Sequence, residues 1–281
     1  MGTLGTIGIV IAGVIIHDYL GEVFRGVADT AKQHGYSLIT NIQNPRRQDN
    51  LAHLLAPGVC DGIVVVLPHN SLEVLDQCRA SGRECVLIDY ARDEDARIFP
   101  TVLSTNREGT LSVMQHLFAL GHTRIGFMSA DQESATARER LAGYREALQT
   151  AGIDYDPALV RNGSWTQQAS YTVAKELLHL PVPPTAIAAS CDLAALGTMQ
   201  AARELGLEIG RQISITGFDD IHMASSTTPP LTTIHQQIYE LGQTAVEMLV
   251  KLLNGDPLEE RHVRLTTELI VRQSTGPAPA P

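Results

Sequence analysis

The chain has 281 residues, of which 44% are hydrophobic and 19% are charged. This length exceeds that of most single compact cores, and the composition excludes a disordered or fibrous protein, so we expect a soluble globular chain with two domains. The formal net charge is -10, from 31 acidic and 21 basic residues, so most of the surface should repel phosphate. This chain by itself should therefore bind DNA weakly.

Residues 6 to 16 form an apolar stretch near the start of the chain. No basic segment precedes it and no cleavage site of small residues follows it at the usual distance, so we expect no signal peptide. No run is long enough to cross a membrane. The cysteines at positions 60, 78, 85 and 191 show neither CxxC nor Cys/His metal spacing, which indicates reduced thiols in a cytoplasmic protein. We expect no metal and no cofactor.

Short apolar runs of the kind that form strands buried on both faces recur along the chain, at Thr6–Ala12, Gly62–Leu67, Cys85–Asp89, Arg124–Ser129, Thr185–Ala189 and Ile213–Gly217. Between them lie segments of helical period, with one stripe at Leu20, Val23, Phe24, Val27 and Ala31 and another at Leu141, Tyr144 and Leu148. This alternation predicts an α/β protein with parallel sheets built from βαβ units. Because the pattern begins afresh near residue 124, we expect two similar lobes.

Several residues mark where helices begin and end. Ser134 and Asp192 precede helical stretches, so each is expected to cap its helix by accepting backbone N–H bonds. Helix-ending glycines follow such stretches at positions 35, 82, 121, 152 and 206. The Pro/Ala/Gly-rich tail, Thr275–Pro281, is expected to be a frayed end.

The more specific motifs along the chain are Leu120–Gly126 (LGHTRIG), Ala137–Tyr144 (ARERLAGY), Asp192–Gly197 (DLAALG), Gly217–Ile221 (GFDDI) and Pro229–Ile234 (PPLTTI). Each motif alone is a weak signal. In this order and spacing they resemble the LacI/GalR family of repressors, over essentially the whole chain after the first few residues.

The resemblance implies a type I periplasmic-binding-protein-like fold, with an effector held in the cleft between two lobes and three strands crossing between them. Mapped onto this sequence, the amino-terminal lobe is 1–122 plus 235–254, and the other lobe is 123–234 plus 255–281. It also implies a homodimer that binds operator DNA through a helix-turn-helix head of about sixty residues ahead of the first strand. Only five residues precede that strand here, so we expect a truncated regulator.

Three residues match positions where the family contacts its effector. Arg140 matches an arginine that forks onto adjacent ligand oxygens, which suits the planar guanidinium. Trp165, the only tryptophan, lies where the family places an aromatic ring, and such a ring suits the C–H face of a sugar; ordinary core packing is its other interpretation. Asp219 matches a carboxylate that accepts bonds from ligand hydroxyls. A small polar effector, a sugar or sugar derivative, is therefore expected.

Four further candidates depart from the family pattern or are less specific. After the first strand, His17 and Tyr19 occupy positions where the family shows other residues, so both are expected to line the cleft. Cys191 replaces an amide that hydrogen-bonds the ligand, although packing is the commoner role of a lone cysteine. Asp89 ends a predicted strand and is expected to lie at or just behind the ligand.

The sequence bears on two other classes of protein. A transport-associated periplasmic sugar-binding protein of the same fold would carry a leader peptide, and the motifs at 137–144 and 229–234 favour the repressor over it. An enzyme is not expected, because the glycines of the first strand precede the turn that would cradle a dinucleotide. No GxSxG elbow, P-loop or zinc spacing appears in the sequence.

Overall fold

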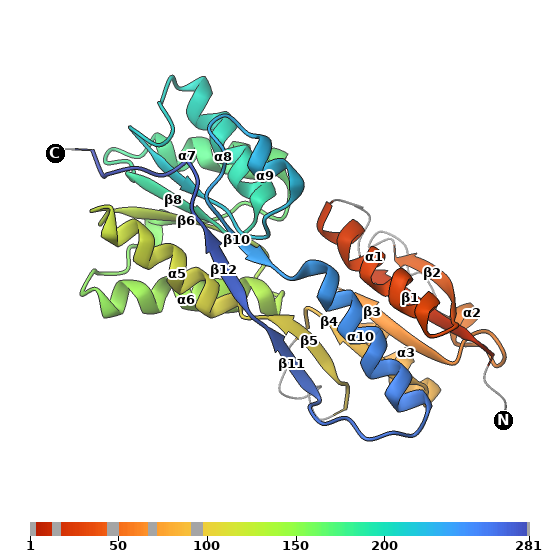
Figure 1. The fold of residues 1–281 in the computed structure, drawn as a ribbon. Helices are drawn as coiled ribbons and strands as arrows, with labels where there is room; N and C mark the ends of the chain where they lie inside the picture. The colour runs from red at the N-terminus through yellow and green to blue at the C-terminus, as the bar shows by residue number, and fades with distance from the viewer. Residues whose placement is uncertain (1–3, 13–17, 44–50, 67–71, 91–97, 280–281) are drawn as a thin grey trace. The chain divides into compact units, whose positions relative to one another are not determined.

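The computed structural model describes residues 4–12, 18–43, 51–66, 72–90 and 98–279. The chain forms two compact units: unit 1 is Met1–Ser104 with Gln237–Leu265, and unit 2 is Thr105–Gln236 with Thr266–Pro281. The chain therefore passes between the units three times, and we name these passages the first, second and third connections (Figure 1).

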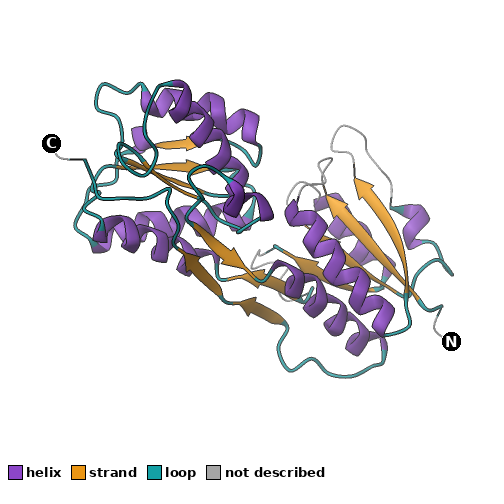
Figure 2. Cartoon of the chain, turned by 45° about the horizontal axis from the view of Figure 1, so that its top comes forward, coloured by secondary structure: helices purple, strands orange, loops and turns teal. Residues whose placement is uncertain are grey.

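Unit 1 is built on a six-stranded sheet in the order β11-β5-β4-β3-β1-β2, and all of its described pairings are parallel. The strands are β1 (Thr6–Ala12), β2 (Ser37–Gln43), β3 (Gly62–Val66), β4 (Glu84–Ile88), β5 (Thr101–Ser104) and β11 (His262–Leu265). The helices are α1 (Asp18–Gln33), α2 (Ala52–Leu55), α3 (Leu72–Ser81) and α10 (Ile238–Leu253). Figure 2 shows these strands with helices beside them.

Apolar side chains project from both faces of this sheet, because successive residues of a strand point to opposite sides. In β3, Val64 and Val66 pack with α1 and α10, whereas Ile63 and Val65 pack with α2 and α3. All five residues of β3 are buried, which explains why the strand reads as one continuous apolar run.

Unit 2 has a parallel four-stranded sheet in the order β7-β6-β8-β9, and a separate antiparallel pair, β10 with β12. The strands are β6 (Ile125–Ser129), β7 (Val160–Asn162), β8 (Ala186–Ala189), β9 (Ser214–Thr216), β10 (Thr233–Gln236) and β12 (Thr267–Ile270). The α-helices are α5 (Asn106–Ala119), α6 (Ala135–Thr150), α7 (Gln167–Leu178), α8 (Asp192–Glu204) and α9 (His222–Ser226), and a 3-10 turn covers Pro157–Leu159. One face of the parallel sheet packs against α5 and α6, and the other against α7 and α8.

The prediction of an α/β chain with parallel sheets flanked by helices is confirmed, but two expected lobe boundaries differ from the observed ones. α5 belongs to unit 2 because its apolar residues Val113, Met114 and Leu117 join the same core as α6. β11 belongs to unit 1 because it pairs in parallel with β5. The boundaries therefore lie after residues 104 and 265, and not after 122 and 254.

Of the two predicted helix caps, one is confirmed and one is wrong. The Ser134 hydroxyl accepts a bond of 3.4 Å from the Ala137 N–H at the start of α6. At α8 the capping residue is Cys191, whose sulfur accepts from the Ala194 N–H, and Asp192 is the first helical residue. The carboxylate of Asp192 binds groups outside the helix, so the preceding side chain takes the capping position.

The carboxyl-terminal tail is not a frayed end through residue 279. His116 Nε2 lies 3.0 Å from the hydroxyl of Thr275, and the Gly276 N–H donates to the Ser214 hydroxyl. The Ala278 N–H donates to the Leu120 carbonyl over 2.8 Å. Polar partners along unit 2 thus hold a segment whose composition predicted disorder, and only its last two residues lie outside the described part of the chain.

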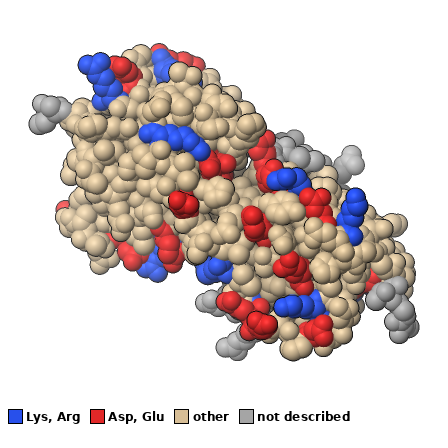
Figure 3. Space-filling view, viewed as in Figure 1, with Lys and Arg blue, Asp and Glu red and all other residues tan. Residues whose placement is uncertain are grey.

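On the face drawn in Figure 3, basic and acidic side chains are interspersed and the basic ones form no stripe, in line with the acidic net charge. Within the described ranges, none of the helices has the length and apolar character that a bilayer crossing requires.

Candidate functional site

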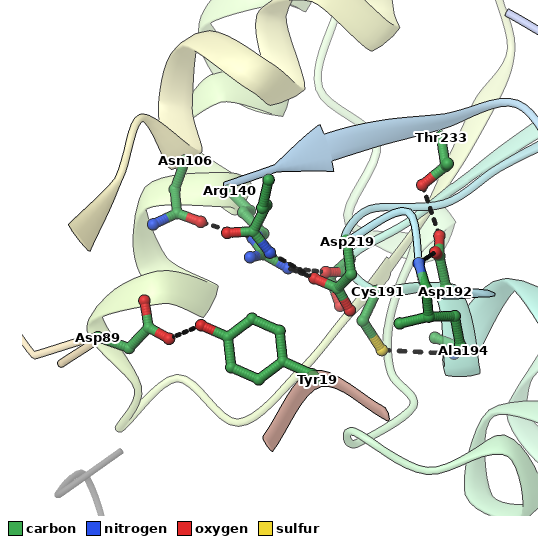
Figure 4. A network of polar contacts seen from close by, with 12 residues as sticks. Tyr19, Asp89, Asn106, Arg140, Cys191, Asp192, Ala194, Asp219 and Thr233 are labelled. Atoms are coloured by element: carbon green, nitrogen blue, oxygen red, sulfur yellow. Dashed lines mark hydrogen bonds and ion pairs between the residues drawn. The ribbon is translucent and has the colours of Figure 1, made fainter. Parts of the chain in front are cut away.

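The candidate residues of unit 2 come from loops and helices that follow the carboxyl ends of its parallel strands. Trp165 follows β7, Cys191 follows β8 and Asp219 follows β9, while Arg140 lies on α6, which follows β6. Ligands of open α/β sheets bind at this edge, because the loops after neighbouring parallel strands converge there. Figure 4 shows Arg140, Asp219 and Cys191 close together. We call Asn106, Arg140, Trp165, Ser190, Phe218, Asp219 and Gln236 the Arg140 cluster.

Arg140 is the centre of this cluster and is 3% exposed. Its Nε donates to Asn106 Oδ1 over 2.8 Å, and its Nη1 donates to the carbonyl of Ser190 and lies 3.5 Å from Asp219 Oδ1. Among the described residues Nη2 of Arg140 has no hydrogen-bond partner, which leaves the two N–H groups of that nitrogen available to an incoming ligand. A guanidinium fixed on one side therefore offers donors on the other.

A glycine sets the distance between the two helices that carry Arg140 and Asn106. A Cβ built on Gly143 of α6 would lie 2.6 Å from the Arg107 carbonyl oxygen and 3.0 Å from Thr110 Cβ, both in α5. Only glycine allows this approach of the two backbones. The glycine of the ARERLAGY motif thus serves the Arg140–Asn106 hydrogen bond.

Two aromatic rings flank the guanidinium. Arg140 Cζ lies 3.6 Å from the ring centroid of Phe218 and 5.8 Å from that of Trp165. Stacking on Phe218 is a cation–π contact that holds the guanidinium plane. The indole Nε1 of Trp165 is buried and has no hydrogen-bond partner among the residues that the structure describes, although the ring also packs against the core that contains α7 and α8. Both interpretations of Trp165, core packing and ligand contact, are thus compatible with its position.

Asp219 is held by a polar contact from another strand. Gln236, in β10, donates from Nε2 to Asp219 Oδ1 over 2.6 Å, so the oxygen that faces Arg140 also accepts from this amide. The neighbouring Asp220 pairs with Arg272 at 2.6 Å and with His235 at 3.2 Å. The two adjacent carboxylates therefore belong to different networks.

Backbone strain gathers in the same loops. Positive φ without glycine occurs in the described residues at Asp89, Ser164, Asp219 and Asp220, with φ of 58°, 60°, 126° and 58°. Such conformations cost about 1–3 kcal/mol each and gather at ligand-binding and catalytic sites. Each of the four belongs to a strand-end loop that also holds a candidate residue, which supports these loops as the functional edge.

Cys191 and Asp192 lie beneath the cluster and are fully enclosed. Burial, with a further contribution from Asp219, raises the pKa of the Cys191 thiol far above its ordinary value, so the thiol stays protonated and unreactive. Burial, again with Asp219 nearby, raises the pKa of Asp192 well above the usual carboxyl value. Asp192 accepts from the Ile221 N–H over 2.9 Å and from the Thr233 hydroxyl over 2.5 Å, which ties the β9 loop to β10.

In unit 1, two candidates form a pair of their own. The Tyr19 hydroxyl, in the first turn of α1, donates to Asp89 Oδ2, directly after β4 (Figure 4). Both side chains are buried, at 7% and 3% exposure. They too follow the carboxyl ends of parallel strands. His17 lies outside the described residues.

The sequence did not predict Asn106, Ser190, Phe218 or Gln236 as members of this cluster. Ser190 and Phe218 directly precede Cys191 and Asp219, so adjacency was an available signal for both. Asn106 and Gln236 carry no such signal, because their partners are 34 and 17 residues away in the chain and meet only through tertiary packing.

The described ranges hold no group of three or more His, Cys, Asp or Glu side chains that could bind a metal ion. The Arg140 cluster offers groups for hydrogen bonding and stacking: one guanidinium, one carboxylate, two amides, one hydroxyl and two aromatic side chains.

Comparison with known proteins places this geometry in a family. Residues 114–275 match the profile of the periplasmic binding protein-like domain. The chain is 31% identical over 276 residues to the HTH-type transcriptional repressor CytR of Escherichia coli (strain K12). The alignment covers 96% of this chain and 80% of CytR.

Two solved structures are also similar. A complex of the transcriptional regulator CelR with cellobiose has a TM-score of 0.90 and 25% identity, over 96% of this chain and 84% of that chain. The lac repressor dimer bound to operator and the anti-inducer ONPF has a TM-score of 0.84 and 27% identity, over 98% and 95% of the two chains. Because a repressor is 31% identical over 96% of this chain and the family profile matches residues 114–275, this chain belongs to the LacI family of transcriptional regulators.

Proposed function

We propose that this chain is the sensing region of its regulator and that it binds a small, neutral, hydroxyl-bearing effector, a sugar or sugar derivative, at the Arg140 cluster. The observation that carries the proposal is a set of polar atoms at the Arg140 cluster that have no hydrogen-bond partner among the described residues. Within the described part of the chain, Nη2 of Arg140 makes no hydrogen bond, and Trp165 Nε1 and Ser190 Oγ are buried without partners. Buried polar groups without partners are costly, so a ligand that satisfies them gains affinity.

Charge favours a neutral effector over an anionic one. Arg140 already faces the carboxylate of Asp219 at 3.5 Å, and the enclosed Asp192 lies close to that carboxylate. A phosphate or carboxylate brought to Arg140 would meet Asp219 at short range in a poorly solvated place, where like charges repel strongly. A hydroxyl can accept from the arginine and donate to the carboxylate, which satisfies both.

Two further observations support a sugar. The rings of Phe218 and Trp165 beside Arg140 suit the apolar C–H faces of a pyranose or furanose. The similar regulator CelR is described in complex with cellobiose. Arg140 and Asp219 would fix hydroxyls at the ring edge, and the aromatic side chains would select the ring itself.

Trp165 provides the experiment, because the only tryptophan of the chain lies beside the proposed site. We expect that titration with a panel of neutral mono- and disaccharides and nucleosides gives a saturable change in tryptophan emission for at least one compound. The corresponding sugar phosphates should give no such change. A response to the phosphates alone would overturn the charge argument, and silence from the whole panel would overturn the proposed effector class.

The Tyr19–Asp89 pair of unit 1 was also predicted to contact the effector, and that stays a prediction. Tyr19→Phe should weaken binding of the responding compound severalfold if the hydroxyl contacts it. Tyr239→Phe is the matched control, because its hydroxyl lies in unit 1 on an exposed bond of 3.3 Å to Asp29. Equal affinity of both variants would remove Tyr19 from the site.

We further propose that the regulator acts in the cytoplasm as a homodimer and that effector binding alters operator affinity through a helix-turn-helix head. This proposal is supported by the similarity to known regulators: CytR is an HTH-type repressor, and the similar lac repressor is a dimer bound to operator. Sedimentation at tens of micromolar, an ordinary range for a stable interface, should show a dimer. A strictly monomeric chain would contradict this part of the proposal.

A further inference from the structure

The Arg140 cluster is bonded to the points at which the chain enters and leaves unit 2. The first connection enters unit 2 at Thr105, directly before Asn106, and the second leaves it at Gln236. Both amide side chains are buried, at 0% and 2% exposure. Each makes a hydrogen bond to one member of the central ion pair.

These bonds form one continuous line of contacts. Asn106 Oδ1 accepts from Arg140 Nε over 2.8 Å, Arg140 Nη1 faces Asp219 Oδ1 at 3.5 Å, and the same Oδ1 accepts from Gln236 Nε2 over 2.6 Å. Four side chains thus link two passages of the chain that are 130 residues apart in sequence. Arg140 and Gln236 share one carboxylate oxygen of Asp219. A change at either donor therefore alters the strength of the other donor's contact with that oxygen.

Gln236 carries a second feature that points to the effector. Its Oε1 is buried and has no hydrogen-bond partner in the described part of the chain. An amide that donates to Asp219 on one side and has an unused acceptor on the other is placed to receive a ligand hydroxyl. The end of β10 would then respond directly to an occupied site.

The third connection is anchored separately. The Thr267 N–H donates to the Thr105 hydroxyl over 3.0 Å, and the Thr267 hydroxyl donates to the Thr105 carbonyl over 3.2 Å. This anchor ties the third connection to the first without a contact from the charged pair. The strand β10 also offers a contrast, because His235 bonds Asp220, which bonds Arg272, a network without Arg140.

We propose that Asn106 and Gln236 are positioning residues that couple the Arg140–Asp219 pair to the first and second connections between the units. An effector that binds the pair would thereby change how firmly both connections are held. In this way binding at the Arg140 cluster would affect the rest of the chain. Residues at the ends of elements are where such changes are absorbed in two-unit proteins. The inference rests on the proposed effector site for its biological use.

The test uses hydrogen exchange on the ligand-free 281-residue chain, so its outcome is independent of whether any sugar binds. Gln236→Leu should raise exchange at the start of α5, over residues 107–112, by at least about threefold, the lower range of coupling between residues in one network. His235→Ala, on the same strand, should leave that segment unchanged. Exchange in unit 1 at β3 reports whether a variant is merely less stable overall.

Reciprocity separates coupling from local damage. Asn106→Ala should raise exchange at the end of β10, residues 234–238, and it replaces Gln236→Leu as the primary test if that variant does not fold. In an Arg140→Met background, Gln236→Leu should no longer affect α5. If Gln236→Leu changes only its own strand, if His235→Ala acts equally on α5, or if the effect persists without Arg140, the proposed coupling is wrong.

Discussion

Replacement of Arg140 by alanine should destabilise unit 2 strongly. The substitution deletes the donor to Asn106, the donor to the Ser190 carbonyl and the cationic partner of Asp219, all within a side chain that is 3% exposed. Removing one partner of a buried ion pair leaves an uncompensated charge and costs about 3–5 kcal/mol. Urea unfolding followed by circular dichroism should therefore show a lower midpoint with an unchanged slope.

Two comparisons make this expectation sharp. Arg138→Ala changes the same residue type on the same helix, but its side chain is exposed and donates to the carbonyls of Gln132 and Glu133, so the cost should stay below about 1 kcal/mol. Arg140→Met combined with Asp219→Asn removes both charges and should recover part of the loss. If Arg140→Ala costs no more than Arg138→Ala, the ion pair does not organise this cluster and our interpretation of its contacts fails.

Two further predictions concern parts of the chain away from the cluster. Gly242→Ala should lower the melting temperature of unit 1 markedly, because its Cβ would lie 2.3 Å from the Val23 carbonyl oxygen where α10 meets α1. At Gly21, a Cβ would meet no described atom outside its own helix within 4 Å, so Gly21→Ala should be neutral or stabilise α1 by up to about 1 kcal/mol. A similar melting temperature for the two variants would contradict the close packing. Burial lowers the pKa of His122, whose ring lies 2.9 Å from the hydroxyls of Thr185 and Ser214. In the unfolded chain the imidazole takes up a proton near pH 6.5, whereas in the folded chain it does so only at lower pH, so thermal stability should fall as the pH drops below about 6.5. His122→Asn should make thermal stability less dependent on pH in this range. An unchanged pH profile in this variant would exclude His122 as the cause.

The sequence predicted six strands of the two parallel sheets to within about one residue, β1, β3, β4, β6, β8 and β9, because they are apolar throughout. The run Thr6–Ala12 coincides with β1, and Ile213–Gly217 brackets β9 by one residue at each end. A strand covered by helices on both sides must be apolar throughout, so its composition alone reveals it. The strands of these sheets that were not predicted are β2, β5, β7 and β11. Three of them, β2, β7 and β11, lie at sheet edges and contain polar residues, whereas β5 is a short buried strand with a threonine and a serine at its ends.

The candidate site was less predictable because its connections are tertiary. Family motifs indicated Arg140 and Asp219, and the structure brings these two together at 3.5 Å. The amides that hold them, Asn106 and Gln236, come from the ends of other elements, and no spacing in the sequence links them to the ion pair. The cap at α8 shows the same limit, since Asp192 has the better capping chemistry but its carboxylate binds the Ile221 N–H and the Thr233 hydroxyl.

The central claim is that a neutral, hydroxyl-bearing effector binds at Arg140, and calorimetric titration tests it most directly. The panel of neutral sugars and nucleosides is titrated into the wild-type chain, into Arg140→Lys, which keeps the charge but loses the forked donor geometry, and into Arg138→Lys as the control. We predict that at least one compound binds the wild type with a Kd below about 1 mM, and that Arg140→Lys alone weakens it at least about tenfold, equivalent to about 1.4 kcal/mol. Equal affinity of Arg140→Lys and the wild type for that compound, or no binding by any compound of the panel, would contradict the claim.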